Sequence, residues 1–218
     1  MSEPDATALL LAALVCGERL AVMRAHDDVA LAPDERSRRQ QEDIARNEEQ
    51  NFALVAARLE EVDAPELAER FLPFFEAFHR ACAPSTWIEA QTLHYTGDAL
   101  VSEFAEFLAG KLDPVSAGVV HTTLGEREDQ EAFALTELQR AMDADPTARA
   151  AIASYARRIS GEALTQTKRA VDSAQALRDM LGGFQGEKEL LLDLLERHRA
   201  RLDRLGIDLL DDDEDDEL

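Results

Sequence analysis

The sequence LLLAALVCGERLAVMRAHDDV, residues 9–29, decides the fold class. Apolar side chains recur in it at alternating steps of four and three residues, the spacing of a helix that turns one seam towards its neighbours in a bundle. The seam positions are Leu11, Val15, Glu18, Val22, Ala25 and Val29. Glu18 is the one charged residue among them, so the sequence predicts a core helix that carries a carboxylate inside the protein.

Prolines and glycines lie mostly where a helical periodicity ends, and no stretch has the alternation of a strand. The sequence therefore predicts an all-α protein, an antiparallel four-helix bundle with two additional C-terminal helices. The bundle helices are expected at residues 5–31, 33–62, 85–112 and 114–143, a fifth from 145 to 181, and a sixth at 187–205 after Gly182-Gly183. Residues 65–82, which contain Pro73 and several phenylalanines, are expected to form a broken crossover between the second and third helices.

The other bundle helices also carry acidic residues on their seams. Glu48 lies in the middle of the second seam, Glu89 begins the third, and a polar stretch from Glu126 to Glu131 interrupts the fourth. Burying an unpaired carboxylate is costly, so converging carboxylates need a cation, a shared proton or basic partners. Thr86 leaves an alternative for Glu89, because Thr and Glu three residues apart also form a capping box at the start of a helix.

Three segments carry a family resemblance: PFFEAFHRACAPSTWIEAQTLHYTGDALVSEFAEFLA (73–109), ARRISGEALTQ (156–166) and LLERHRARLDRLGI (194–207). They resemble a family of ferritin-like fold proteins from high-GC Gram-positive bacteria. That family is distantly similar to the di-iron tRNA hydroxylase that acts on methylthio-isopentenyl-adenosine. In ferritin-like di-iron bundles, two helices give a Glu each and two give Glu-x-x-His, all pointing inward. The resemblance implies a ferritin-like fold, but one bundle of this kind supports many chemistries.

The resemblance implies metal-ligand positions at Glu18, Glu48 and Glu89, and a vestigial or weak site. Asn51 stands where the second helix should have the histidine of Glu-x-x-His, and in the fourth helix Arg127 and Gln130 stand at the acidic and histidine positions. Amide oxygens are poor iron ligands compared with imidazole. Arg127 could instead supply the positive charge of a metal. The fourth-helix register stays open between Glu126, Arg127 and Glu128.

Two functions follow from this ligand set. The first is a ferritin-like protein with a vacated di-metal site, no cofactor, and a structural or interaction role. The alternative is a di-iron or di-manganese oxidase or hydroxylase that uses Glu18, Glu48, Glu89 and a carboxylate from Glu126 or Glu128. Neither reading assigns a role to His94 or Tyr95, although Gly97 beside them indicates a close helix approach.

The net charge of −22, from 45 acidic and 23 basic side chains, disfavours nucleic acid as a partner because it repels phosphates. No continuous apolar run approaches the roughly 20 residues of a membrane span, and no basic segment precedes the first apolar run. We therefore expect a cytoplasmic protein without a membrane partner. Cys16 and Cys82 have no ligand-like spacing and are expected to be buried hydrophobes.

The chain is expected to divide into one helical domain, residues 1–207, and a disordered acidic tail, residues 208–218. The tail contains seven consecutive acids, Asp211 to Glu217, and cannot bury apolar surface. The leucine content of the fifth and sixth helices predicts a homodimer through their surfaces.

Overall fold

The computed structural model describes residues 5–125 and 127–207, and within them all regular structure is helical. The predicted all-α fold class is confirmed. The long helices are α1 (Ala6–Val29), α2 (Glu35–Glu61), α3 (Ala68–Ala81), α5 (Ala99–Ala109), α6 (Pro114–Leu124), α7 (Arg127–Ala144), α8 (Ala148–Asp172) and α10 (Gly183–Asp203). Shorter elements are a 3-10 turn (Pro65–Leu67), α4 (Trp87–Leu93), a π-helical segment (His94–Asp98) and α9 (Gln175–Leu181).

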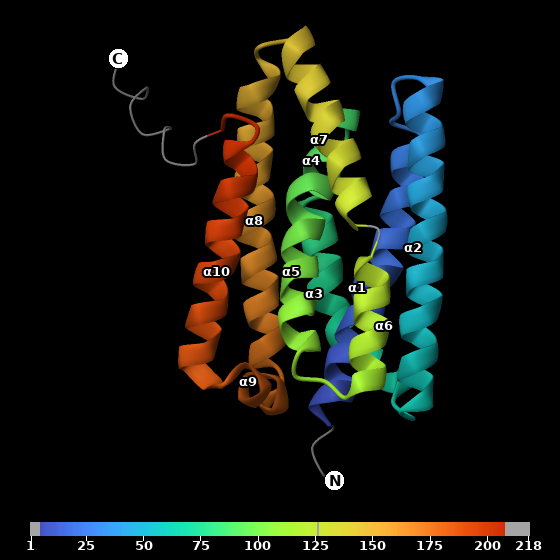
Figure 1. The fold of residues 1–218 in the computed structure, drawn as a ribbon, viewed down its shortest axis with the longest axis vertical. Helices are drawn as coiled ribbons and strands as arrows, with labels where there is room; N and C mark the ends of the chain where they lie inside the picture. Colours follow the sequence, from blue (N-terminus) through green and yellow to red (C-terminus); the bar gives the residue numbers. More distant parts are fainter. Residues whose placement is uncertain (1–4, 126, 208–218) are drawn as a thin grey trace.

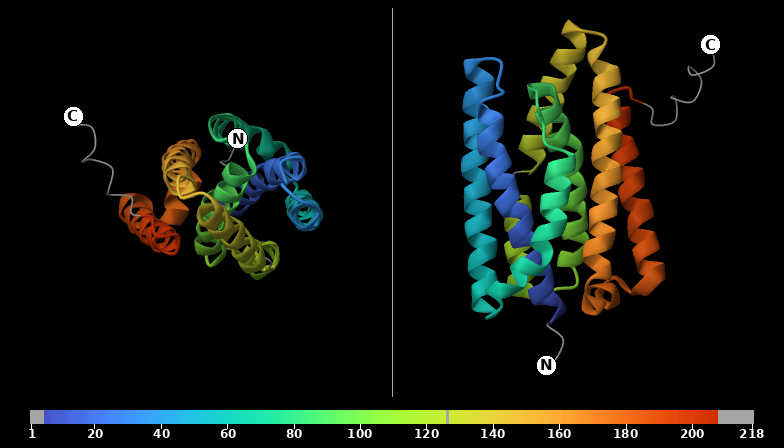
Figure 2. Two further views of the ribbon diagram at one scale, coloured as in Figure 1. Left: turned by 90° about the horizontal axis from the view of Figure 1, so that it is seen from above. Right: turned by 180° about the vertical axis from the view of Figure 1, so that it is seen from behind.

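The helices run roughly along one long axis (Figure 1). α1 and α2 form an antiparallel pair with the most extensive contact in the molecule, and α2 also contacts α6. A continuous helical rod is formed by α4, the π segment and α5 in succession. This rod contacts α6 and α7. α3 packs against α1 and α8, while α10 packs against α5 and lies beside α8 at one edge (Figures 1 and 2). The acidic seams of α1 and α2 therefore face the rod that contains the π segment.

The predicted crossover at residues 65–82 is wrong in its main feature, because α3 is a continuous helix through Pro73. Its stability comes from burial. Phe71 is fully buried, and Phe74, Phe75 and Phe78 pack against the same core. Proline removes one backbone donor from a helix, and tertiary packing of an apolar face compensates for that loss here.

Four predicted helices differ from the structure. The third is divided by the π segment, the fourth is divided between Leu124 and Arg127, and the fifth ends at Asp172, after which α9 is separate. The second begins after Asp34, whose carboxylate accepts from the backbone N–H of Ser37, rather than at Pro33. The predicted break at Gly182-Gly183 is confirmed, since Gly182 has a left-handed φ of 87°.

α1 has the length and apolar composition of a membrane-crossing helix. The search for an uninterrupted apolar run in the sequence overlooked this property, because charged residues interrupt the run in this helix. In the structure α1 packs against α2, α3 and α9, and Glu18, Arg24 and Asp28 on it are buried. The absence of a membrane partner and the cytoplasmic location stay predictions, as does the division at residue 207. The predicted acidic tail lies outside the described residues.

Gly97 allows the π segment to approach α8. A Cβ at this position would lie 2.8 Å from Leu93 Cδ1 and 3.1 Å from Ile159 Cγ2, and both of those side chains are buried. Gly97→Ala is therefore expected to lower the free energy of unfolding by about 1–3 kcal/mol through overpacking, measured by urea denaturation. Gly118→Ala on α6, with no atom within 4 Å, is the matched control and should raise stability by about 0.5–1 kcal/mol. Similar effects at the two positions would contradict the close contact.

Candidate functional site

An acid pair lies between the first two helices. Glu18 of α1 is 6% exposed and Glu48 of α2 is 2% exposed, and the two carboxyl groups are immediate neighbours. Burial, together with the neighbouring charge of Glu48, raises the pKa of Glu18 to about 8. A carboxyl group with a pKa of about 8 keeps its proton at neutral pH, and this proton removes the repulsion between two buried carboxylates.

Arg127 of α7 lies beside this pair. Its Nη2 is 3.5 Å from Glu18 Oε1, and its Nη1 donates to the backbone carbonyl of Asp98 at 3.5 Å. The Arg127 side chain is 19% exposed. Burial opposes the guanidinium charge, but the carboxyl groups of Glu18, Glu48 and Asp98 outweigh it and raise the pKa of Arg127. A fixed positive charge therefore stands next to the acid pair.

A second group of charges continues from the pair along α1 and the π segment. Arg24 Nη2 is 2.7 Å from both carboxylate oxygens of Asp98. His94 Nδ1 is 2.8 Å from Asp98 Oδ2, and His94 Nε2 is 3.2 Å from Asp28 Oδ2. We name these residues, together with Glu18, Glu48 and Arg127, the buried charge cluster.

His94 is held between two carboxylates, one at each ring nitrogen. Although burial alone lowers its pKa, the hydrogen bonds to Asp28 and Asp98 reverse that effect and raise the pKa to about 9. The Asp98 pKa is far below its usual range; burial would raise it, but Arg24 and His94 override that effect. His94 is therefore an imidazolium that donates from Nδ1 to Asp98 and forms an ion pair through Nε2 with Asp28.

Two glutamines border the histidine. Gln91 Nε2 donates to Gln41 Oε1 at 3.4 Å, and Gln41 Nε2 donates to the carbonyl of Ala25 at 3.4 Å. Both glutamines are fully buried. They connect α1, α2 and α4 around the charged residues with neutral hydrogen bonds.

The structure does not bring Glu89 to the acid pair, so the predicted convergence of three carboxylates is wrong. The Glu89 carboxylate accepts from the backbone N–H and hydroxyl of Ser85 at 2.7 and 2.6 Å, and Thr86 Oγ1 accepts from the Glu89 N–H. This is the capping alternative, and Arg158 lies 4.0 Å from the same carboxylate. Ser85, immediately before the N-cap Thr86, holds the Glu89 side chain at the start of the helix.

The remaining predicted residues do not complete a ligand set with the pair. Asn51 donates from Nδ2 to the carbonyl of Thr123 at 3.3 Å. Gln130 is half-buried on the turn of α7 after Arg127, and Glu128 is exposed. Glu126, one of the alternatives for the fourth helix, lies outside the described residues.

Sequence reasoning missed Arg24, Asp28, His94 and Asp98 as members of one site. A signal for them was present, because Arg24/Asp28 and His94/Asp98 are each four residues apart, and side chains at that spacing share one helix face. Two such pairs of opposite charge on two core helices indicate a network between the helices.

The donors in this cluster do not fit a di-metal centre. Glu18 and Glu48 are two neighbouring carboxyl groups, of which Glu18 keeps a proton, and two guanidinium groups and an imidazolium occupy their surroundings. Both nitrogens of His94 are directed to carboxylates, so neither offers a lone pair to a cation. Within residues 5–125 and 127–207, no three His, Cys, Asp or Glu side chains group as a metal site.

The helical fold with an acid pair on adjacent core helices defines a ferritin-like bundle protein. The chain matches the family described as the ferritin-like domain of actinomycetes over residues 4–184, and it belongs to that family. A search among curated proteins finds no match.

The proton on Glu18 predicts a pH dependence. Stabilisation by the proton on Glu18 is fully present below its ordinary pKa of 4.5 and is lost as pH rises through about 8. The free energy of unfolding of the natural protein minus that of Glu18→Gln should therefore fall as pH rises from 5 to 8, measured by urea denaturation. The same difference for exposed Glu60→Gln on α2 is the control. If the difference for Glu18→Gln does not change with pH, Glu18 carries no extra proton in the folded protein.

Proposed function

We propose that this ferritin-like protein has a vacated di-metal site, filled by the buried charge cluster, and has a structural or interaction role without redox catalysis. The observation that carries the proposal is the Arg127 guanidinium beside Glu18. The family resemblance assigns a carboxylate to the position of Arg127. A guanidinium there supplies one positive charge and repels a cation.

Charge balance supports this proposal. The cluster contains four carboxyl groups, Glu18, Glu48, Asp28 and Asp98, and three cations, Arg24, Arg127 and His94. With Glu18 protonated, three negative charges face three positive charges. Burying charges costs less when opposite charges are paired, and this balance supports a cluster that is stable without a metal.

The oxidase or hydroxylase alternative requires ligands that the described residues do not bring together. Glu89 caps α4, and Asn51 is hydrogen-bonded to the backbone of Thr123. The similarity to the tRNA hydroxylase stays a prediction from the sequence. A net charge of −22 argues against a tRNA substrate, because tRNA-binding surfaces are basic.

Metal analysis of the purified protein tests the proposal. Protein produced with added iron and added manganese is expected to hold far less than one metal atom per chain by plasma mass spectrometry, and chelator treatment should leave its melting temperature unchanged. Two metal atoms per chain, or a melting temperature lowered by chelator, would overturn the vacated site.

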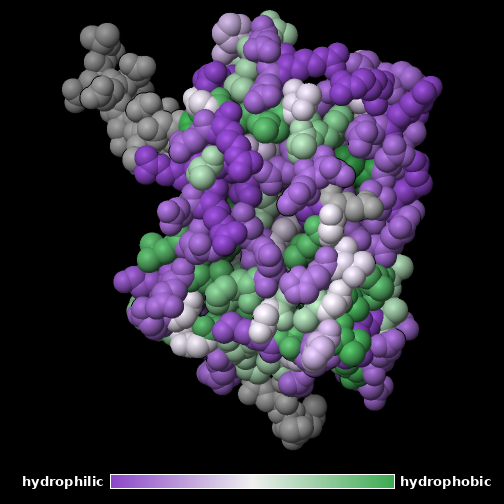
Figure 3. Space-filling model, in the orientation of Figure 1, coloured by the Kyte–Doolittle hydropathy of each residue, from purple (hydrophilic) through white to green (hydrophobic). Residues whose placement is uncertain are grey.

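We propose that the interaction role includes the predicted homodimer. α10 exposes Leu192 and Leu195, and the loop end of the same helix exposes Phe184 at 81%. In Figure 3 hydrophobic surface gathers in the lower half of the view, over α5, α6 and the lower part of α10. A single-chain mass by light scattering at high micromolar concentration would contradict the dimer.

A further inference from the structure

Two adjoining cavities with mostly apolar walls lie apart from the buried charge cluster. The first, of about 110 Å³, is a partly open pocket lined by α1, α3, α5, α8, α9 and Leu194 of α10, and the second, of about 290 Å³, lies between α5, α8 and α10. Phe104, Leu164 and Val171 line both. Together the cavities reach the range of roughly 300–1,000 Å³ that is typical of small-molecule sites.

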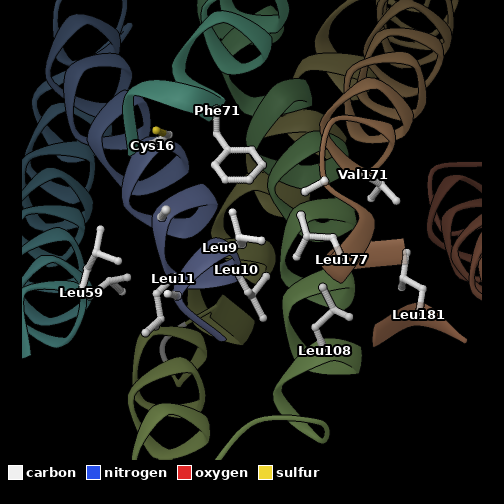
Figure 4. Packing of buried hydrophobic residues seen from close by; sticks show 14 of the residues in the cluster. Leu9, Leu10, Leu11, Cys16, Leu59, Phe71, Leu108, Val171, Leu177 and Leu181 are labelled. Carbon is white, nitrogen blue, oxygen red and sulfur yellow. The ribbon is translucent and has the colours of Figure 1, made fainter. Parts of the chain in front are cut away.

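The walls of the first cavity are almost entirely hydrocarbon. Phe71 from α3, Leu10 from α1, Leu108 from α5 and Leu177 from α9 line it, and Figure 4 shows these side chains directed towards a common centre. An apolar cavity of this kind offers a water molecule too few hydrogen bonds, whereas an apolar ligand fills it favourably. The body of a ligand here is therefore a hydrocarbon chain.

Gln166 and Thr167 on α8 are the two polar residues that line the first cavity in the described part of the chain, and Gln166 is the one whose buried acceptor lacks a partner there. Its side chain lines the first cavity and the residue is only 6% exposed. Its Nε2 donates to Glu162 Oε1 at 2.6 Å, which fixes which end of the amide is the oxygen. Gln166 Oε1 is buried and has no hydrogen-bond partner among the described residues. A buried acceptor without a donor is unfavourable, so this residue of the cavity wall has one acceptor left for a ligand that donates a hydrogen bond.

The charges at the cavity do not suit an anionic ligand. Among the described lining residues Lys168 is the one cation, and its Nζ is already 2.9 Å from Asp172 Oδ2 and 3.9 Å from Glu187 Oε1. The Glu162 carboxylate lies next to the Gln166 amide. A carboxylate or phosphate head group would meet negative charge without a free cation.

We propose that these cavities bind a slender aliphatic alcohol, whose chain fills the apolar space and whose hydroxyl donates a hydrogen bond to Gln166 Oε1. A hydroxyl supplies the missing donor and carries no charge. This inference is independent of the vacated metal site.

Binding of 1-octanol, octane and octanoate to the full-length protein tests the ligand class by calorimetry and by shifts in melting temperature. We expect 1-octanol to bind and to raise the melting temperature, because a ligand that binds only the folded state stabilises it. Octane should bind about tenfold more weakly, the usual contribution of one hydrogen bond, and octanoate more weakly still.

Three variants locate the site. Gln166→Met should remove the preference for the alcohol over the alkane, and Gln175→Met, at an exposed position on α9, should retain it. Ala163→Leu should weaken binding of both ligands, because Ala163 lines the first cavity and a leucine fills it.

Four results would overturn the proposal: no binding of 1-octanol up to its solubility, equal affinity for octane, tighter binding of octanoate, or an unchanged affinity in Ala163→Leu. Circular dichroism confirms that each variant is folded. If Gln166→Met does not fold, the comparison of the three ligands on the natural protein decides the ligand class alone.

Discussion

Replacement of Arg24 by methionine is expected to lower the free energy of unfolding by about 3–5 kcal/mol, the usual cost of leaving a buried charge without its partner. Arg24 Nη2 is 2.7 Å from both carboxylate oxygens of Asp98, and the Arg24 side chain is 9% exposed. Methionine keeps most of the apolar volume but leaves the Asp98 carboxylate with His94 and with Arg127, which contacts only the Asp98 backbone carbonyl. Urea denaturation at pH 7 measures the loss.

Arg19→Met is the matched control, because Arg19 is exposed on the same helix. That variant should change stability by less than about 0.5 kcal/mol. The double variant Arg24→Met/Asp98→Asn should recover part of the loss, since a neutral amide no longer leaves a charge unpaired. If Arg24→Met costs no more than Arg19→Met, the two buried groups are not coupled as the structure indicates.

Arg127→Leu is expected to cost about 2–4 kcal/mol, because it leaves Glu48 and the Asp98 region without one of their cations. The effect is smaller than at Arg24 for two reasons. The nearest contact, to Glu18 Oε1, is 3.5 Å long, and the proton on Glu18 already neutralises that partner. Thermal and urea unfolding measure the change.

The same variant separates a filled site from a metal site. If Glu18 and Glu48 held a metal, Arg127→Leu would be nearly neutral, and chelator would lower the melting temperature of both the natural protein and the variant. In the cation-filled site, combining Arg127→Leu with Glu48→Gln should cost less than the sum of the two separate effects, because each removes the partner of the other.

The acid pair could be predicted because Glu18 and Glu48 interrupt otherwise apolar seams. The same method overlooked Arg24 and Asp28, since it assumed that α1 buries one face only. In the structure α2 and α3 cover different sides of α1, and the five consecutive residues Ala8 to Ala12 are all buried. A helix covered on several sides can bury charges outside its seam.

Two other differences arise from signals that compete locally. The sequence Ser85-Thr86 followed by Glu89 predicts both a helix start and a seam position, and the unpaired N–H groups of the new helix decide between them. Proline at position 73 predicts a break, but the apolar face of α3 has enough burial to keep the helix continuous. The π segment could not be predicted from the periodicity of apolar residues. One additional residue in a helical turn shifts the positions of the later side chains around the helix but leaves the composition unchanged.

That additional residue sets the register of half the bundle. A π turn accommodates one residue more than an α turn, and each residue of an α-helix rotates the chain by about 100°. Deleting one residue between His94 and Asp98 would straighten the rod and rotate α5 relative to α4. Phe104 and Leu108 would then leave the apolar cavities, while Asp98 would move away from Arg24. Related proteins that keep both the charge cluster and the cavities are therefore expected to have no insertion or deletion in this segment. Point substitutions there can still be tolerated.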